Sequence, residues 1–103
     1  MLPIDFTDGS GSKWRPAVII SSDEYNNNSP DVIISSITGN LKAIPHLGDH
    51  IIVEWEKAGL KLPSIAQVKV ATVEKSMIGR KLGIMFKKDI DGIDKGIKQA
   101  FGL

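Results

Sequence analysis

The sequence predicts a protein of the α+β class, a small antiparallel β-barrel followed by one C-terminal helix, and three observations support this prediction. Short runs rich in Val and Ile recur along the chain and are separated by polar or glycine-containing turns. Apolar residues at helical spacing occur in one long segment, at the C-terminal end. The chain has 103 residues, of which 42% are hydrophobic, and this indicates a packed core and a single domain over residues 1–103.

Six segments are predicted to form strands, because each gathers β-branched or aromatic residues into a short run bounded by turn residues. The alternation of apolar and polar residues after Ser64 predicts a strand with one wetter face. Pro3 restricts the first strand to an edge or starting position, since proline has no N–H to donate. The predicted strands are Leu2–Phe6, Arg15–Ser21, Asp31–Thr38, His50–Trp55, Ser64–Val73 and Arg80–Phe86.

The C-terminal segment Lys88–Phe101 is predicted to be a helix with a single apolar stripe. Two glycines in it weaken the helix by about 1 kcal/mol each relative to alanine, so packing must hold it in place. Its three aspartates are interpreted as the solvated face rather than as a metal site. The stripe consists of Ile90, Ile93, Ile97 and Phe101, the glycines are Gly92 and Gly96, and the aspartates are Asp89, Asp91 and Asp94.

The connecting segments are less regular. Residues 22–30 predict a loop with one short helical turn, residues 56–63 a loop, and residues 74–78 a turn. Proline and glycine break any regular element between residues 41 and 48.

Charge and composition restrict the function. The formal net charge is +1, so any binding of nucleic acid must come from a local basic patch rather than from a global field. The absence of cysteine excludes disulfides and thiolate zinc sites and is compatible with a cytoplasmic location. No apolar run approaches the ~20 residues that a membrane span needs, and no leader peptide is evident.

The junction between a glycine- and serine-rich loop and the strand at Arg15 is the most informative stretch of the sequence. Lys13, Trp14 and Arg15 place two cations and an indole beside a rigid strand. An arginine can bind a phosphate through two hydrogen bonds, and a tryptophan can stack on a base. These residue types favour a nucleic-acid ligand.

The same stretch, Gly9-Ser10-Gly11-Ser12-Lys13-x-Arg15-Pro16-Ala17-Val18-Ile19-Ile20-Ser21, resembles the start of the MazF/PemK-type toxins, the ribonuclease members of toxin–antitoxin pairs. Further matching motifs follow in the same order and extend the resemblance over almost the whole chain. They are Ser35-Ser36-Ile37-Thr38, Ala58-Gly59-Leu60-Lys61-Leu62-Pro63-Ser64, Ala71-Thr72-Val73-Glu74-Lys75-Ser76 and Gly102-Leu103. The resemblance implies an SH3-like barrel, which agrees with the strand pattern.

The resemblance also implies a sequence-selective endoribonuclease that cuts single-stranded RNA, namely mRNA, without a metal or other cofactor. In that reaction the ribose 2′-hydroxyl attacks the neighbouring phosphate and leaves a 2′,3′-cyclic phosphate and a 5′-hydroxyl. Arg15 matches the family arginine that acts at the cleaved phosphate, and Thr38 matches its strand-end active-site threonine. Ser36 lies two residues before Thr38 and shares its face of the strand. We expect RNA contacts from Ser12, Lys13, Trp14, Ser36, Ser64, Gln67 and Lys69.

The general base is left open by the sequence. Some relatives carry an arginine and an aspartate on the strand after the Pro-Ser pair, where this chain has Gln67 and Lys69. The base is one of His46, His50, Asp8 and Glu24, or none of them. The resemblance implies a homodimer as the active form and an antitoxin protein as a partner. The alternative function is a non-catalytic toxin of the same fold that binds a protein target such as DNA gyrase.

Overall fold

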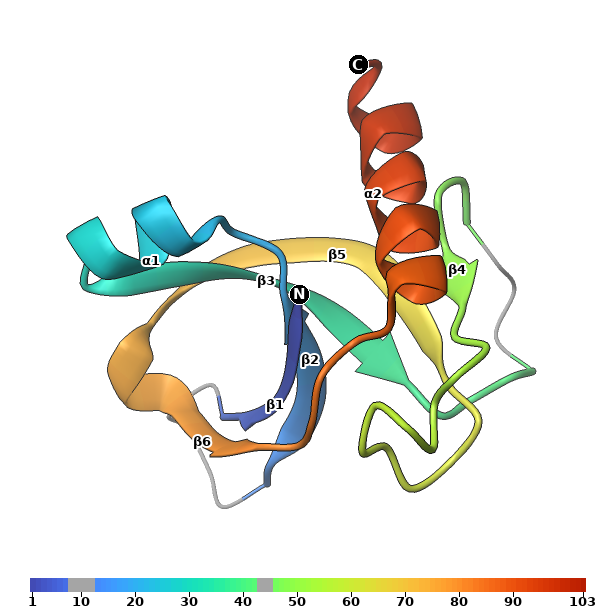
Figure 1. Ribbon diagram of the computed structural model, residues 1–103, viewed down its shortest axis with the longest axis horizontal. Helices are drawn as coiled ribbons and strands as arrows, with labels where there is room; N and C mark the ends of the chain where they lie inside the picture. The colour runs from blue at the N-terminus through green and yellow to red at the C-terminus, as the bar shows by residue number, and fades with distance from the viewer. Residues whose placement is uncertain (8–12, 43–45) are drawn as a thin grey trace.

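In the computed structural model, which describes residues 1–7, 13–42 and 46–103, six antiparallel strands form one curled sheet and a long helix rises from it (Figure 1). The strand order is β4-β5-β3-β2-β1-β6. The predicted α+β class with a C-terminal helix is thereby confirmed. The elements are β1 (Leu2–Phe6), β2 (Arg15–Ile19), α1 (Asp23–Asn28), β3 (Asp31–Thr38), β4 (His50–Ile51), β5 (Ile65–Glu74), the short 3-10 helix η1 (Lys75–Met77), β6 (Ile78–Lys81) and α2 (Lys87–Phe101).

Alternation along the strands divides the core between the two faces of the sheet. On β2, Val18 packs into one cluster, whereas Ala17 and Ile19 pack into the other. The first cluster lies between the sheet, α2 and the segment after β4, and it contains Val18, Ile37, Ile52, Ala58, Leu60, Ala66, Met85 and Ile93. The second cluster is enclosed by the curled strands and contains Ile4, Ala17, Ile19, Val32 and Ile34.

Strand β1 is not an edge, because it pairs with β2 on one side and with β6 on the other. Pro3 is accommodated because its carbonyl accepts from Leu82 N (2.9 Å), on the side of β6 and just beyond the end of that strand at Lys81. In an antiparallel pair, the N and the C=O of one residue face the same neighbouring strand. An N–H at Pro3 would therefore point towards Leu82, beyond the end of β6, so the proline removes no hydrogen bond from within that strand. Of the two positions predicted for Pro3, the edge is wrong, whereas Pro3 does lie near the start of its strand, as the second residue of β1.

Two predicted strands are much shorter than expected. The predicted strand His50–Trp55 pairs only over His50–Ile51, and residues 53–59 form turns. The N–H groups of Val53 and Glu54 donate to the Asp89 carboxylate at 2.8 and 2.9 Å instead of to a neighbouring strand. The predicted strand Arg80–Phe86 pairs with β1 only as far as Lys81, and beyond it Pro3 can accept from Leu82 N but has no N–H to donate in return.

Helix α2 spans Lys87–Phe101, as predicted to within one residue, and it ends at Gly102 with a left-handed φ of 73°. Both glycines within it are sites of close packing. A Cβ on Gly92 would lie 2.2 Å from the His50 ring, and a Cβ on Gly96 would lie 1.9 Å from the Gly48 carbonyl oxygen. Close approach of the helix to β4 and its preceding loop therefore requires glycine at both positions.

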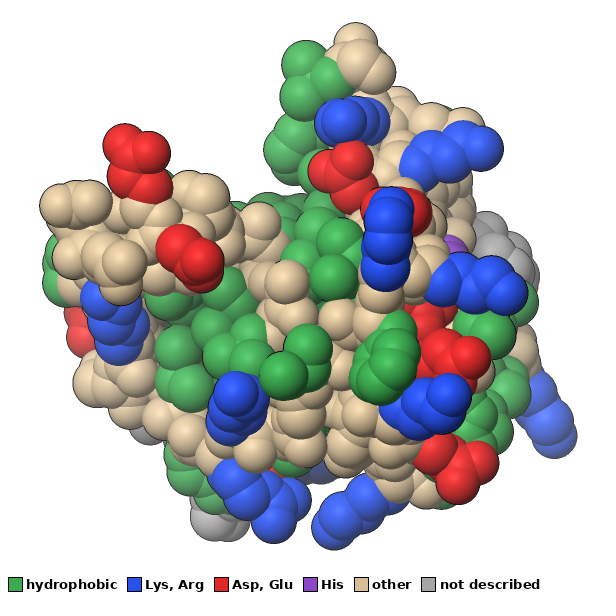
Figure 2. All heavy atoms as spheres, in the orientation of Figure 1, with side chains coloured by type: hydrophobic (Ala, Val, Ile, Leu, Met, Phe, Trp, Pro, Cys, Tyr) green, Lys and Arg blue, Asp and Glu red, His purple; other side chains and the backbone are tan. Residues whose placement is uncertain are grey.

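The faces of α2 differ from the prediction at two residues. Asp89 is fully buried rather than solvated, because it binds the backbone of the segment after β4. Phe101 continues the apolar stripe but is 61% exposed, since the helix has by then risen above the sheet (Figure 1). Basic and acidic side chains intermingle on the outer surface of α2 (Figure 2), where Lys87 pairs with Asp91 and Lys98 with Asp94.

No helix among the described residues is both long and apolar enough to cross a membrane.

Candidate active site

A groove with a cavity volume of about 380 Å³ opens at one end of the curled sheet. Five of the residues predicted to catalyse the reaction or bind RNA line it together, although they come from three strands. They are Arg15, Ser36, Thr38, Gln67 and Lys69, and the remaining lining residues are Phe6, Pro16, Ile37 and Asn40.

Strand alternation explains why these side chains face the same space. Arg15 points to the same face of β2 as the core residues Ala17 and Ile19. Ser36 and Thr38 likewise continue the row of Val32 and Ile34 on β3. The groove is therefore the polar end of the face whose other end is the second core cluster. Phe6 continues the row of Ile4 on β1 in the same way, which sequence alternation could have indicated.

A large bulge in β5 brings Gln67 and Lys69 into the groove. Ser35 pairs with Val70, whereas Ile37 pairs with Ala66, so the single residue Ser36 lies opposite residues 67–69. Bulges bend a strand and redirect its side chains. The sequence prediction treats this strand as regular and does not include the bulge.

The backbone of the bulge is held by two side chains from outside β5. The buried Ser35 hydroxyl donates to the Gln67 carbonyl, and Val68 N donates to Asp49 Oδ1 at 3.2 Å. The second carboxylate oxygen of Asp49 accepts from His46 N at 3.0 Å. Ser35 and Asp49 thus satisfy backbone groups that the bulge removes from the β-ladder. Sequence reasoning missed both residues, because their role exists only once the bulge is known.

The groove is cationic. Arg15 and Lys69 are exposed, and the described lining residues include no Asp, Glu or His. Hydroxyl groups of Ser36 and Thr38 and the amides of Asn40 and Gln67 complete its polar surface. Such a surface can bind a phosphodiester through charge-assisted hydrogen bonds and contact an adjacent base through an amide.

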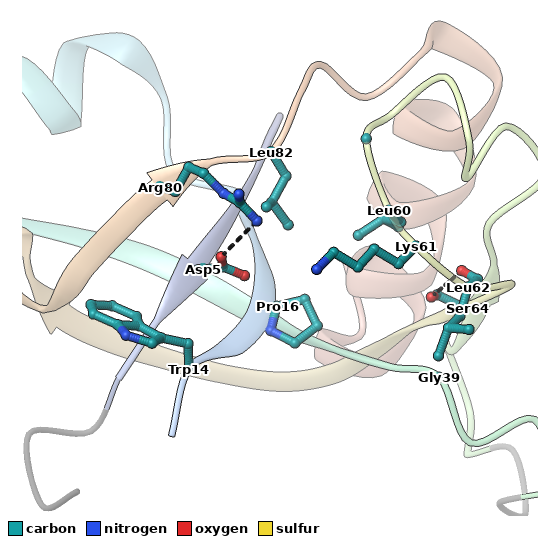
Figure 3. A pocket seen from close by; sticks show the side chains of 11 residues that line it. Asp5, Trp14, Pro16, Gly39, Leu60, Lys61, Leu62, Ser64, Arg80 and Leu82 are labelled. Atoms are coloured by element: carbon teal, nitrogen blue, oxygen red, sulfur yellow. Dashed lines mark hydrogen bonds and ion pairs between the residues drawn. The ribbon is translucent and has the colours of Figure 1, made fainter. Parts of the chain in front are cut away.

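Trp14 and Ser64 lie in a second cavity of about 280 Å³, on the other side of the β1–β2 end (Figure 3). Ser64 is buried there, and its hydroxyl donates to the Leu62 carbonyl at 2.7 Å. Three charged residues that the sequence did not single out also line this cavity, namely Asp5, Lys61 and Arg80. Arg80 Nη2 lies 3.6 Å from Asp5 Oδ2 (Figure 3).

Trp14 is 52% exposed, and its six-membered ring covers Gly79 of β6. A Cβ at Gly79 would lie 2.6 Å from Trp14 Cζ3, so the indole requires glycine beneath it. The ring is therefore seated on the sheet while much of its surface remains open to a ligand.

None of the described candidates for the general base lines the groove. Nε2–H of His50 donates to Asp89 Oδ1 at 2.8 Å, next to α2. His46 is exposed in the loop before β4, and Glu24 is exposed on α1. Lys13 is exposed and lines neither cavity. Asp8 and Ser12 lie outside the described residues.

Comparisons with known proteins agree with this fold. Residues 2–101 match the PemK-like, MazF-like toxin family of type II toxin–antitoxin systems. The chain is also 30% identical over 90 residues to the endoribonuclease MazF of Staphylococcus saprophyticus, covering 86% of this chain and 74% of that protein. The chain therefore belongs to the PemK/MazF toxin family.

Solved structures show the same fold at low sequence identity. The Mycobacterium tuberculosis toxin MazF-mt6 superposes with a TM-score of 0.77 at 21% identity, covering 99% of this chain and 96% of that chain. A mycobacterial endoribonuclease solved in complex with its cognate antitoxin gives a TM-score of 0.80 at 20% identity, covering 99% and 92%.

Proposed function

We propose that this protein is the toxin of a toxin–antitoxin system and acts as an endoribonuclease on single-stranded RNA, with mRNA in the cytoplasm as its substrate. The observation that carries the proposal is the convergence of Arg15 and Thr38 in one cationic groove, with Lys69 and Gln67 brought in by the β5 bulge. Membership of the toxin family and similarity to an endoribonuclease MazF support the same activity.

In the proposed reaction, the ribose 2′-oxygen bonds to the neighbouring phosphorus while the bond from phosphorus to the 5′-oxygen breaks. The 2′-hydroxyl loses its proton and the departing 5′-oxygen gains one, which leaves a 2′,3′-cyclic phosphate and a 5′-hydroxyl. Negative charge grows on the phosphoryl oxygens in the transition state. The Arg15 guanidinium neutralises that charge, and the Thr38 hydroxyl donates to a phosphoryl oxygen, with Ser36 as a further donor.

Single-stranded RNA suits this groove better than a duplex. The attacking 2′-oxygen must swing into line with the departing oxygen, which a helical backbone resists, and bases must be unstacked to reach the Gln67 amide. Lys69 adds a cation for a flanking phosphate. The net reaction consumes no metal ion or other co-reactant, because the proton that the 2′-oxygen loses is balanced by the proton that the 5′-oxygen gains.

Two protein partners belong to the proposal. The active form is a homodimer, and an antitoxin protein inhibits it by occupying the cationic groove. A similar fold solved in complex with its cognate antitoxin supports the second expectation. An acidic, disordered antitoxin segment that folds on binding would compete with RNA for the same cations.

The first prediction concerns the two anchors of the groove. Arg15→Ala and Thr38→Ala should each abolish cleavage of a long single-stranded RNA in the presence of EDTA, because each removes a group that stabilises the transition state. Thr38→Ser keeps the hydroxyl and should retain much of the activity. The products of the wild type should carry 2′,3′-cyclic phosphate and 5′-hydroxyl ends, which end-specific phosphatase and kinase treatment can identify.

Matched controls lie on exposed surfaces outside the groove. Lys95→Ala removes one cation from α2, and Thr72→Ala removes one threonine from β5, so both should cut RNA as the wild type does. Discrete cleavage by Arg15→Ala would remove Arg15 from the mechanism. If wild-type protein at high concentration leaves RNA intact, the weight moves to a toxin that acts by binding a protein such as DNA gyrase.

A further inference from the structure

We infer that the cavity beside the groove is a base-binding subsite, which takes a nucleobase bearing an amino group from a nucleotide next to the cleaved phosphodiester. The inference rests on the proposed function for its choice of ligand. The residues that carry it are Asp5, Trp14, Lys61 and Arg80 (Figure 3).

The cavity and the groove open on opposite faces of the β1–β2 end and meet at Pro16, which lines both. At three places, consecutive residues of the chain line one and then the other, because successive side chains point to opposite faces. A single nucleic-acid strand that lies in the groove can place a neighbouring base in the cavity by passing around this end of the sheet at Pro16. The consecutive pairs are Asp5 and Phe6, Trp14 and Arg15, and Gly39 and Thr38.

The shape and chemistry of the cavity match a flat base with a polar edge. The Trp14 indole, seated on Gly79 and half exposed, offers a stacking surface beside the apolar ring of Pro16. Lys61 extends into the cavity from the opposite wall (Figure 3), where its ammonium group can contact the phosphate of the bound nucleotide.

Asp5 and Arg80 together define which base edge fits. The carboxylate of Asp5 accepts hydrogen bonds only, and the adjacent guanidinium of Arg80 only donates them. Guanine, cytosine and adenine each present an amino donor next to a ring or carbonyl acceptor, which pairs with this arrangement. Uracil has carbonyl oxygens on both sides of its single N–H and would place one of them against the carboxylate. The subsite should therefore reject uracil.

Asp5→Asn tests the inference without changing the shape of the side chain. The amide can donate as well as accept, so the variant should accept uracil. Nucleoside 5′-monophosphates serve as probes, and the indole N–H resonance of Trp14 reports binding while that of Trp55, on the core side of the loop, is the internal reference. We expect the wild-type protein to bind guanosine, cytidine or adenosine monophosphate at least tenfold more tightly than uridine monophosphate, as measured by titration of the Trp14 shift.

The results separate this inference from the proposed nuclease. The subsite is supported if Asp5→Asn binds uridine monophosphate within about twofold of the other nucleotides. The control Asp23→Asn, on α1, should keep the preference of the wild type. Equal shifts by all nucleotides, no shift by any at millimolar concentration, or unchanged discrimination in Asp5→Asn would overturn it. Because this assay needs no cleavage, an inactive protein that still discriminates overturns the nuclease and keeps the subsite.

Discussion

At the scale of single residues, Asp89 shows how one buried carboxylate determines a local structure. It is fully buried at the start of α2 and accepts hydrogen bonds from His50 Nε2, Val53 N and Glu54 N at 2.8 to 2.9 Å. These bonds end β4 and start the turns that lead to Gly59 and Leu60. That segment in turn lines the second cavity and supplies Leu60 to the core.

Substitution of Asp89 should therefore lower the free energy of unfolding. Asp89→Ala leaves two part-buried backbone N–H groups and His50 without their buried acceptor, which costs about 3 kcal/mol. Chemical denaturation of the two proteins measures the difference in the free energy of unfolding. Asp91→Ala, on the exposed face of the same helix, should change stability by about 0.5 kcal/mol or less. Equal stability of Asp89→Ala and the wild type would contradict the role given to the carboxylate.

The pH dependence of stability follows from the same residue. Burial by itself raises the pKa of Asp89, but the N–H groups of Val53, His50 and Glu54 together lower it below its ordinary value. The folded state therefore binds fewer protons than the unfolded state, whose aspartate pKa is about 3.9. The contribution of Asp89 should be complete above about pH 4 and disappear as the pH falls through the lower pKa of the folded protein. Denaturation curves of wild type and Asp89→Asn should accordingly converge in acid.

At the scale of elements, the β5 bulge determines the chemistry of the groove. If β5 paired regularly with β3, only one residue of β5 would lie opposite Ser36. Gln67 and Lys69 would then not both reach the groove. The conformation persists because Ser35 and Asp49 satisfy the displaced backbone groups. Ser35 and Asp49 therefore position Gln67 and Lys69 indirectly, through the bulge.

Loss of these contacts should release the bulge. Ser35→Ala leaves the Gln67 carbonyl without its buried donor and should lower the free energy of unfolding by about 1 to 3 kcal/mol. Asp49→Ala should speed hydrogen exchange of the Val68 amide, which loses its acceptor, while amides on the β1–β2 pair keep their protection. Ser76→Ala on the exposed turn is the matched control. An unchanged exchange rate at Val68 would show that Asp49 does not hold the bulge.

At the scale of the whole molecule, function depends on local rather than total charge. The net charge is +1, and cations and anions mix over the surface in Figure 2. Arg15 and Lys69 nevertheless face one groove whose described residues carry no acid. Binding of RNA should therefore be salt-dependent through a small number of contacts rather than through a general attraction.

The salt dependence of binding checks this expectation. For a single strand, the logarithm of the association constant changes with the logarithm of salt concentration by about 0.7 per neutralised phosphate. Lys69→Ala should reduce the magnitude of that slope by about 0.7, whereas Lys95→Ala on α2 should leave it unchanged. Fluorescence anisotropy with a fully 2′-O-methylated RNA, which has no attacking hydroxyl, measures binding alone. The same slope for Lys69→Ala and wild type would place Lys69 away from the phosphates.

Much of this protein follows from its sequence because the relevant physics is local. The β-branched runs at Arg15–Ile19 and Asp31–Thr38 and the apolar stripe of α2 have periods that specify strand and helix without reference to the rest of the chain. Alternation along a strand also placed Ser36 and Thr38 on one face. The motif around Arg15, together with those that follow it along the chain, indicated the family that the comparisons then confirmed.

Tertiary structure alone decided the features that depend on contacts between distant residues. The apolar run after His50 has the composition of a strand, but Asp89, 39 positions away from His50, takes its backbone N–H groups and turns the chain. The bulge in β5 has no local signal, because it exists through Ser35 and Asp49. Asp5 and Arg80 meet beside Trp14 only because β1 pairs with both β2 and β6. Periodicity determines which residues share a face, whereas the closure of the sheet determines which faces meet.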